Sequence, residues 1–330
     1  MSAPDPVDRL RRLRTTPAVR DLVADVNLST NDLVAPLFVR EQIVEPQPIE
    51  SLPGVVQHTV DSVRREVAEL VELGLRAVVL FGVPAVKDAV GSGAYDPDGI
   101  VQVALRALRA DLGDEVVLIA DLCVDEYTDH GHCGVLDAHG RVDNDATLEL
   151  YARAGVAQAD AGAHIVAPSG MMDGQVAAIR EALDRAGHQS PAILAYAAKY
   201  ASALYGPFRD AVDVEIADGG DRRGYQQDPR RRREAMLEIT RDLEQGADMI
   251  MVKPAVAYLD IIAAAHERFE VPLAAYHVSG EYAMVHAAAE RGWIDGPAVM
   301  VEQLTAIKRA GADLILTYAA RSFAESVGRP

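Results

Sequence analysis

The sequence consists largely of short, continuously apolar segments of β-prone residues that alternate with longer stretches of helical periodicity over most of its 330 residues. The eight apolar segments are residues 33–39, 77–83, 116–122, 164–167, 192–198, 249–252, 272–278 and 314–318. Strands that are apolar throughout are typical of a parallel sheet buried on both faces. Eight repeats of strand and helix predict an α/β fold, a single (β/α)8 TIM barrel over residues 31–330.

The joints between helices and strands support this interpretation. Helical periodicity is clearest at residues 59–73, 145–161, 174–186, 232–245 and 299–310. At four joints a glycine directly follows the helical stretch and the next strand begins within three residues, at Gly74, Gly162, Gly246 and Gly311. Glycine can adopt the left-handed conformation that closes a helix. A doubly wound sheet is the alternative fold, but no glycine-rich phosphate loop follows the first strand.

The charge balance restricts the class of partner. The chain carries 32 Lys and Arg residues against 50 Asp and Glu residues, a formal net charge of −18. Such an acidic body repels nucleic acid and anionic membranes, so we expect neither as a partner. The sequence has no apolar run of 18 residues and does not begin with the apolar core of a signal peptide, which predicts a soluble, cytoplasmic protein. Its two cysteines cannot form a disulfide framework.

Residues 1–30 precede the predicted barrel and contain a basic cluster, RLRRLR, at residues 9–14. One interpretation is a solvated tail. The other is an arm that docks on the acidic surface of a neighbouring subunit. The spacing of the residues alone favours the tail.

Two lysines indicate where the chemistry takes place. The chain has four lysines against 28 arginines, and Lys199 and Lys253 each end an apolar strand. Active sites of these barrels lie at the carboxyl ends of the strands. Burial lowers the pKa of a lysine, and a neutral amine is the nucleophile of Schiff-base chemistry on carbonyl substrates. A buried lysine paired with a carboxylate is the structural alternative, but two lysines at successive strand ends favour a catalytic role.

Two polar segments surround these positions. Residues 121–134 contain two thiols, two imidazoles and several carboxylates, which suit zinc, although the spacing matches no standard zinc finger and a plain polar loop is the alternative. The long stretch after the fifth strand predicts either a lid or a disordered insert. Its Arg209, Arg222 and Gln226 have the donors to clamp a carboxylate, although abundant arginines are usually surface residues.

The sequence resembles the porphobilinogen synthase, or delta-aminolevulinic acid dehydratase, family over essentially its whole length. Seven motifs carry the resemblance: APSGMMDG at 167–174, YAAKY at 196–200, YGPFR at 205–209, GDRR at 220–223, MVKP at 251–254, YHVSGEY at 276–282 and LTY at 316–318. The resemblance implies a lyase of haem and tetrapyrrole biosynthesis that condenses two molecules of 5-aminolevulinate into porphobilinogen with loss of two waters. It also implies a barrel assembled as a homo-octamer, which favours the subunit arm for residues 1–30.

The family pattern also implies a role for each matching residue. Lys253 resembles the lysine that forms a Schiff base with the first substrate, and Lys199 the one that holds the second. Ser279 and Tyr318 match residues that bind the first carboxylate. The remaining matches concern the second substrate: Arg209, Arg222 and Gln226 for its carboxylate, within a lid at about 200–228, and Asp121 and Ser169 facing its amino group.

The metal pattern falls between two branches of the family. One branch binds a catalytic zinc with three cysteines, and another has aspartate or alanine there and needs none. This chain has Cys123, Asp125 and Cys133 at those positions. Two expectations stay open: a zinc site with a harder ligand set, or a loop without zinc in which Asp125 organises water or another cation. Glu238 matches the residue that binds an allosteric Mg²⁺ through water and stabilises the octamer, with an exposed helix residue as its alternative.

Two other classes of protein remain as alternatives. A class I aldolase-like barrel would normally need one reactive lysine rather than two. A non-catalytic relative would keep the barrel and have lost turnover, since barrels host many functions.

Overall fold

The computed structural model describes residues 9–217 and 220–327. Eight parallel strands form a closed barrel, since the last strand pairs with the first. In their order around the barrel these strands are β1 (Leu33–Arg40), β4 (Ala77–Val83), β5 (Val117–Leu122), β6 (Ile165–Pro168), β7 (Ala192–Lys199), β8 (Met249–Lys253), β9 (Leu273–His277) and β10 (Leu314–Thr317). The predicted (β/α)8 barrel is therefore confirmed.

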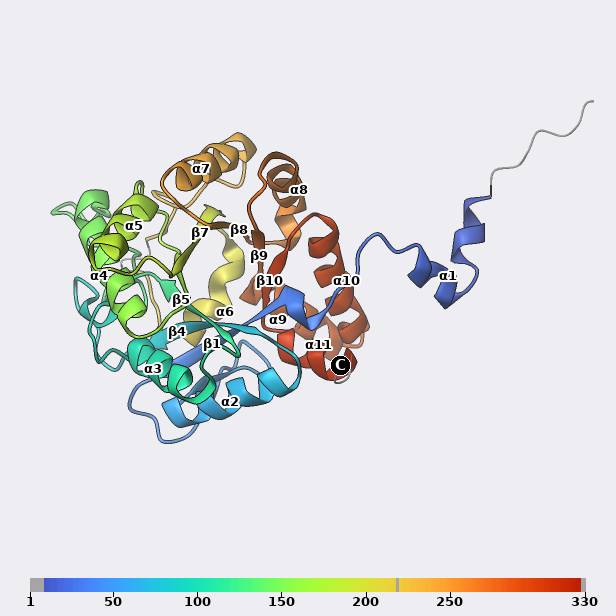
Figure 1. Ribbon diagram of the computed structural model, residues 1–330, viewed down its shortest axis with the longest axis horizontal. Coiled ribbons are helices and arrows are strands. Elements are labelled where there is room, and N and C mark those ends of the chain that lie inside the picture. Colours follow the sequence, from blue (N-terminus) through green and yellow to red (C-terminus); the bar gives the residue numbers. More distant parts are fainter. Residues whose placement is uncertain (1–8, 218–219, 328–330) are drawn as a thin grey trace, which may run out of the picture.

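Helices surround the strands, as Figure 1 shows. They are α2 (Val60–Glu72), α3 (Ile100–Leu112), α4 (Asn144–Asp160), α5 (Gln175–Arg185), α6 (Gly206–Ala211), α7 (Arg232–Glu244), α8 (Leu259–Arg268), α9 (Ser279–Glu290), α10 (Gly296–Arg309) and α11 (Ala320–Val327). Polar caps define several starts: Thr59 accepts a hydrogen bond from the backbone of Ser62 at α2, and Asp143 caps α4 in the same way. The glycines predicted to close four helices all have positive φ, from 90° at Gly74 to 113° at Gly311.

Two strands end later than the sequence predicted, and both ends lie at the expected active site. The fifth and sixth barrel strands, β7 and β8, each continue one residue further and end on Lys199 and Lys253, so both lysines belong to the sheet. Two very short strands, β2 (Gln47–Pro48) and β3 (Val56–His58), extend the sheet beside β1. Strands of two and three residues are too short to have a readable period, and the sequence did not predict them.

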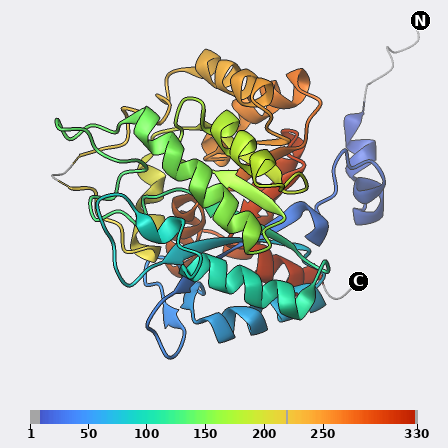
Figure 2. The same ribbon diagram turned by 60° about the vertical axis from the view of Figure 1, so that its left-hand side comes forward.

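The N-terminal segment stands away from the barrel (Figures 1 and 2). Its short α1 (Pro17–Leu22) and the turn of helix at Leu10–Arg14 contain no buried residue, and the Leu22 side chain is 83% exposed. The first eight residues of the expected arm lie outside the described residues, as do 218 and 219 of the expected lid. No helix in the described part of the chain is both long and apolar enough to cross a membrane.

Candidate active site

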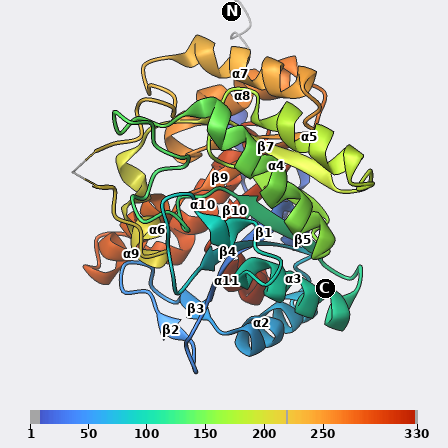
Figure 3. The same ribbon diagram turned by 90° about the vertical axis from the view of Figure 1, so that its left-hand side faces the viewer.

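The two lysines lie side by side at the carboxyl ends of adjacent strands. Lys199 and Lys253 are partners in the pairing of β7 with β8, and each side chain is only 5% exposed. The connections that follow β7 and β9 bring α6 and α9 to this end of the barrel (Figure 3). The amines therefore lie where barrel enzymes place their catalytic groups.

Lys253 is surrounded by aromatic rings. Its Nζ lies 4.3 Å from the ring centroid of Tyr276, 5.1 Å from that of Tyr196, 5.2 Å from that of Phe208 and 5.4 Å from that of Tyr205. Among the described residues, no hydrogen-bond acceptor contacts this amine. Burial, followed by the positive charge of the neighbouring lysine, lowers the pKa of Lys253 to about 7. The lowered pKa favours the neutral amine, which is the nucleophilic form of lysine.

Lys199 has a different environment. Its Nζ donates a short hydrogen bond to the backbone oxygen of Ser169 at the end of β6. The Ser169 hydroxyl in turn donates to Oδ2 of Asp121, at 2.9 Å. Burial raises the pKa of Asp121 to about 6, against the opposing charges of the two lysines. Lys199, Ser169 and Asp121 thus form one connected polar group, whereas Lys253 forms no hydrogen bond among the described residues and is flanked by aromatic rings.

A second polar group lies in the loop after β5. Ligand atoms of Cys123, Asp125 and Cys133 all lie within 4.8 Å of one another, and all three residues are buried. Both thiols are free of disulfides. Burial raises the pKa of Cys123 well above its usual value. The pKa of Cys133 is lowered, because the Cys123 side chain and the charge of Arg222 outweigh the effect of burial.

The donor set fits a thiophilic divalent cation. Two thiols and a carboxylate are three protein ligands, the number typical of a catalytic zinc site that keeps a position open. Asp125 already has a cationic partner, because Nη2 of Arg222 lies 2.7 Å from its Oδ2. Burial opposes ionisation of this carboxyl, but the guanidinium lowers the pKa of Asp125 to about 2. The cluster is thus a candidate metal site with a preformed carboxylate.

The segment after β7 covers these groups. Arg222 also donates to the backbone oxygen of Gly131 at 2.8 Å, and the hydroxyl of Tyr225 accepts a hydrogen bond from the backbone of Cys133. Two buried donors, Nε of Arg222 and Nε2 of Gln226, have no partner among the described residues. Arg209 lies on α6, where burial and then the charge of Arg222 lower its pKa.

The expected site residues divide between neighbouring spaces. Seven of them line one small cavity of about 10 Å³: Asp121, Asp125, Ser169, Lys199, Arg209, Arg222 and Lys253. Ser279 and Tyr318 adjoin it through aromatic residues: the Ser279 hydroxyl accepts from the backbone of Phe208, and the Tyr318 hydroxyl lies 3.1 Å from that of Tyr276. Gln226 and Glu238 line a different, larger cavity.

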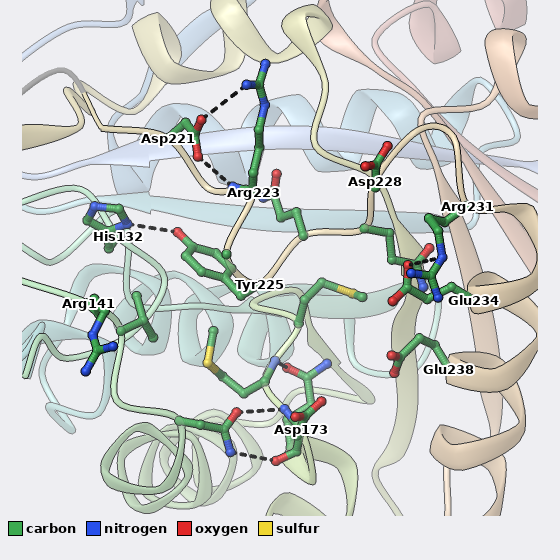
Figure 4. A pocket seen from close by; sticks show the side chains of 18 of the residues that line it. His132, Arg141, Asp173, Asp221, Arg223, Tyr225, Asp228, Arg231, Glu234 and Glu238 are labelled. Atoms are coloured by element: carbon green, nitrogen blue, oxygen red, sulfur yellow. Dashed lines mark hydrogen bonds and ion pairs between the residues drawn. The ribbon is translucent and has the colours of Figure 1, made fainter.

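That larger cavity, of about 750 Å³, is acidic along one wall (Figure 4). Glu234, Glu238 and Asp242 project from successive turns of α7 toward it, and Asp173 faces them from the connection after β6. Burial, followed by the charges of Glu238 and Asp173, raises the pKa of Asp242 to about 7. Among the described residues neither Glu238 nor Asp242 forms an ion pair. Glu238 is half-buried rather than fully exposed.

Sequence reasoning missed several residues of the small cavity. Glu126 is 1% exposed and lines it directly after Asp125, and burial raises its pKa well above the usual value. Tyr205 and Phe208 line it too, although only Arg209 of their motif was given a role. One feature of the sequence could have indicated the aromatic residues of the cavity. Only 5% of the residues are aromatic, yet several of them lie close after the strands, where the site is expected.

Comparison with known proteins agrees with this geometry. The family model described as delta-aminolevulinic acid dehydratase matches residues 7–326. A delta-aminolevulinic acid dehydratase of Streptomyces coelicolor is 58% identical over 324 residues, 98% of each chain, and one of Mycobacterium tuberculosis is 60% identical over 315 residues, 95% of each chain. The crystal structure of delta-aminolevulinic acid dehydratase (porphobilinogen synthase) from Toxoplasma gondii, in complex with the reaction product porphobilinogen, superimposes with a TM-score of 0.95 at 42% identity, covering 98% of this chain and 92% of that one. This chain belongs to the delta-aminolevulinic acid dehydratase family.

Proposed function

We propose that this protein is a porphobilinogen synthase, which condenses two molecules of 5-aminolevulinate into porphobilinogen with loss of two waters. The observation that carries the proposal is the pair of buried lysines, in register on β7 and β8 and facing one cavity with Asp121. An enzyme that activates one carbonyl needs one such amine. Two amines side by side suit two similar keto substrates.

The chemistry follows from the surroundings of each amine. The neutral amine of Lys253 adds to the keto group of the first substrate, and loss of one water gives an imine. A protonated imine withdraws electrons from the adjacent carbon and makes its proton acidic, which allows a carbon–carbon bond to form. Lys199 forms the second imine, and Asp121 with Ser169 faces the amino group of the second substrate.

The carboxylates of the two substrates have separate binding groups. Ser279 and Tyr318 bind the first. Arg209, Arg222 and Gln226 bind the second, and the unpartnered Nε of Arg222 and Nε2 of Gln226 support this role, because buried donors are rarely left unpaired. The segment at 200–228 acts as a lid. A cavity of about 10 Å³ has room for roughly one water, so this segment must move before a substrate enters.

Two metals complete the proposal. Cys123, Asp125 and Cys133 hold a zinc ion, which when bound supplies Lewis-acid chemistry beside the second substrate. Glu238 holds Mg²⁺ through water in the acidic cavity, and this allosteric ion stabilises a homo-octamer. The projecting N-terminal segment, residues 1–30, is the arm that contacts neighbouring subunits, and the enzyme works in the cytoplasm.

The experiment that tests the function is porphobilinogen formation from 5-aminolevulinate, followed by a colorimetric assay for the pyrrole. The protein is treated with a chelator and assayed alone, with zinc and with magnesium. Pyrrole formation is the expected result, and its rescue by zinc would support the role of the cysteine cluster. Full activity without zinc, together with stimulation by magnesium, would leave only the Glu238 site. Imine without pyrrole would favour an aldolase-like lyase, and neither product a non-catalytic relative.

A further inference from the structure

Glu281 is a buried carboxylate in the first turn of α9, two residues after Ser279. Among the described residues its partners are backbone N–H groups rather than basic side chains. Its Oε2 accepts from Val278 at 2.8 Å and from Ala255 at 3.4 Å, and its Oε1 accepts from Val256 at 2.7 Å. One carboxylate therefore binds the backbone of two separate segments.

A helix cap explains only one of these contacts. A glutamate at the third position of a helix commonly reaches back to the N-cap N–H, which here belongs to Val278. Capping does not require burial, and burial raises the pKa of Glu281 to about 7 against the effect of its backbone hydrogen bonds. The other contacts, with Ala255 and Val256, lie in the connection after β8 and need a different explanation.

Those contacts lie beyond the end of the backbone pairing between β8 and β9. The two strands pair in register up to Val252 and Ala275. Lys253 and Ser279 both follow that last pair. The carboxylate of Glu281 thus joins the two connections at the point where the sheet itself has ended.

The two connections follow the groups assigned to the first substrate. The Ser279 hydroxyl accepts from the backbone of Phe208 at 3.0 Å, and the ring centroid of Phe208 lies 5.2 Å from Nζ of Lys253. In 5-aminolevulinate the keto carbon and the carboxyl carbon are three bonds apart, a reach of at most about 4 Å with bonds near 1.5 Å. So short a substrate tolerates little change in the spacing between the amine and the hydroxyl.

We propose that Glu281 is a positioning residue that fixes the spacing between Lys253 and Ser279, and that this spacing selects keto acids with two carbons between the keto and carboxyl groups. The inference rests on the proposed function, in which Lys253 forms the first imine and Ser279 binds the carboxylate of the same substrate. It adds a determinant of substrate chain length. Glu281 is not among the described residues that line the small cavity, so it acts through the connections that it joins.

The test measures imine formation at Lys253 in the full-length Glu281→Gln variant, without turnover. The amide offers one acceptor oxygen, so one set of backbone N–H groups faces an NH2 donor instead. Three ligands are compared: 4-oxopentanoate, 5-oxohexanoate, which is one carbon longer, and pentan-2-one, which has no carboxylate. Borohydride reduces each imine to a stable secondary amine, and peptide mass spectrometry identifies the lysine that carries it.

The expected result is a change of selectivity. In the wild type, 4-oxopentanoate should half-saturate Lys253 at the lowest concentration of the three. In Glu281→Gln that concentration should rise about tenfold or more, the scale of losing a hydrogen bond to a charged group, and the preference over 5-oxohexanoate should shrink. Pentan-2-one should not change, because it uses only the amine.

Asp313→Asn is the matched control. Oδ2 of Asp313 also accepts from a backbone N–H of a neighbouring strand, Leu273 at 2.9 Å, but at the start of β9 and so at the opposite end of the barrel. This variant should trap all three ligands like the wild type. Thermal unfolding checks the fold of each protein. If Glu281→Gln does not fold, Glu281→Asp replaces it: the shorter side chain keeps both oxygens but cannot span the two segments, so the same loss of selectivity is expected.

The other outcomes each decide the question. Equal weakening of all three ligands would mean that Glu281 supports the amine or the fold in general, and unchanged trapping would mean that it only caps α9. Either result overturns the inference about Glu281 while the wild type still makes pyrrole. A wild type in which 4-oxopentanoate labels neither Lys253 nor Lys199, and which makes no pyrrole, would instead overturn the proposed function.

Discussion

The barrel interior and the acidic cavity beside α7 both concentrate carboxylates, but they balance the negative charge differently. In the interior, Asp125 is paired with Arg222, and the charges of both lysines act on Asp121. The protein supplies the counter-charge to the interior carboxylates.

In the cavity, burial raises the pKa of both Glu238 and Asp242, followed by the charges of Asp173 and Glu234 for Glu238 and of Glu238 and Asp173 for Asp242. Arg231 pairs with Glu234, but Glu238 and Asp242 have no ion pair among the described residues, which supports the proposal that a divalent cation binds there.

The two regions should therefore respond to different changes: the interior to substitution of its side chains, and the cavity to pH and added cations. In the interior the charged side chains are balanced by one another. Replacing one of them should therefore remove the role that this side chain has in the reaction. In the cavity, Glu238 and Asp242 lie beside other carboxylates, so we expect their ionisation to depend on pH and on the concentration of divalent cations. The following experiments test that contrast.

The largest effect is expected from Lys253→Ala. Without this amine the first imine cannot form, and pyrrole synthesis should fall by more than about 10³-fold, the scale on which enzymes lose activity with their nucleophile. Steady-state assays measure the loss. Lys308→Ala is the matched lysine control, because its ion pair with Asp32 lies outside the site. Substantial pyrrole formation by Lys253→Ala would remove this residue from its assigned role.

An intermediate effect is expected from Cys133→Ser on zinc affinity. Losing a residue that hydrogen-bonds to a metal ligand typically lowers metal affinity 10–100-fold. Losing the metal ligand itself should therefore lower zinc affinity at least about 100-fold. Competition with a coloured chelator measures this without any turnover. Glu238→Gln should leave zinc affinity unchanged, since its side chain lies in the other cavity. Similar zinc affinity in Cys133→Ser and the wild type would show that the cluster is not the zinc site.

The smallest effect concerns Asp242 and magnesium. The pKa of this carboxyl is 3.8 in the unfolded chain and about 7 in the folded protein. The free energy of unfolding therefore falls as pH rises from about 3.8 to about 7, and the whole loss is present above pH 7. A bound cation offsets that loss. Saturating Mg²⁺ should therefore raise Tm by about 1–3 °C more at about pH 8 than at about pH 6.

Asp242→Asn is the variant that isolates this effect. The amide cannot ionise, so most of the pH dependence of the Mg²⁺ shift should disappear. A shift in the wild type that is equal at both pH values would mean that the cavity carboxylates do not bind the ion.

The sequence predicted the parts of the molecule that local pattern determines. Continuous apolar runs ended by polar residues were enough to predict the barrel and to place Lys199 and Lys253 at its active end. The position of the Tyr196 ring beside both amines could not be predicted from alternation within one strand, because the register of β7 against β8 shifts between Ala195 and Ala198. The pairing of Asp125 with Arg222 joins residues far apart in the chain, and only the folding of the segment after β7 over the loop after β5 brings them together.

The contacts of Arg222 and Tyr225 with the loop after β5 also have a kinetic consequence. The cavity is small while these contacts are in place, so we expect them to break when substrates enter and again when the pyrrole leaves. We therefore predict that opening of this segment, rather than bond formation, limits turnover, as lid motion does in many enzymes. Raising solvent viscosity should lower the turnover rate of such an enzyme. Weakening the Tyr225 contact should speed product release and admit more water to the site.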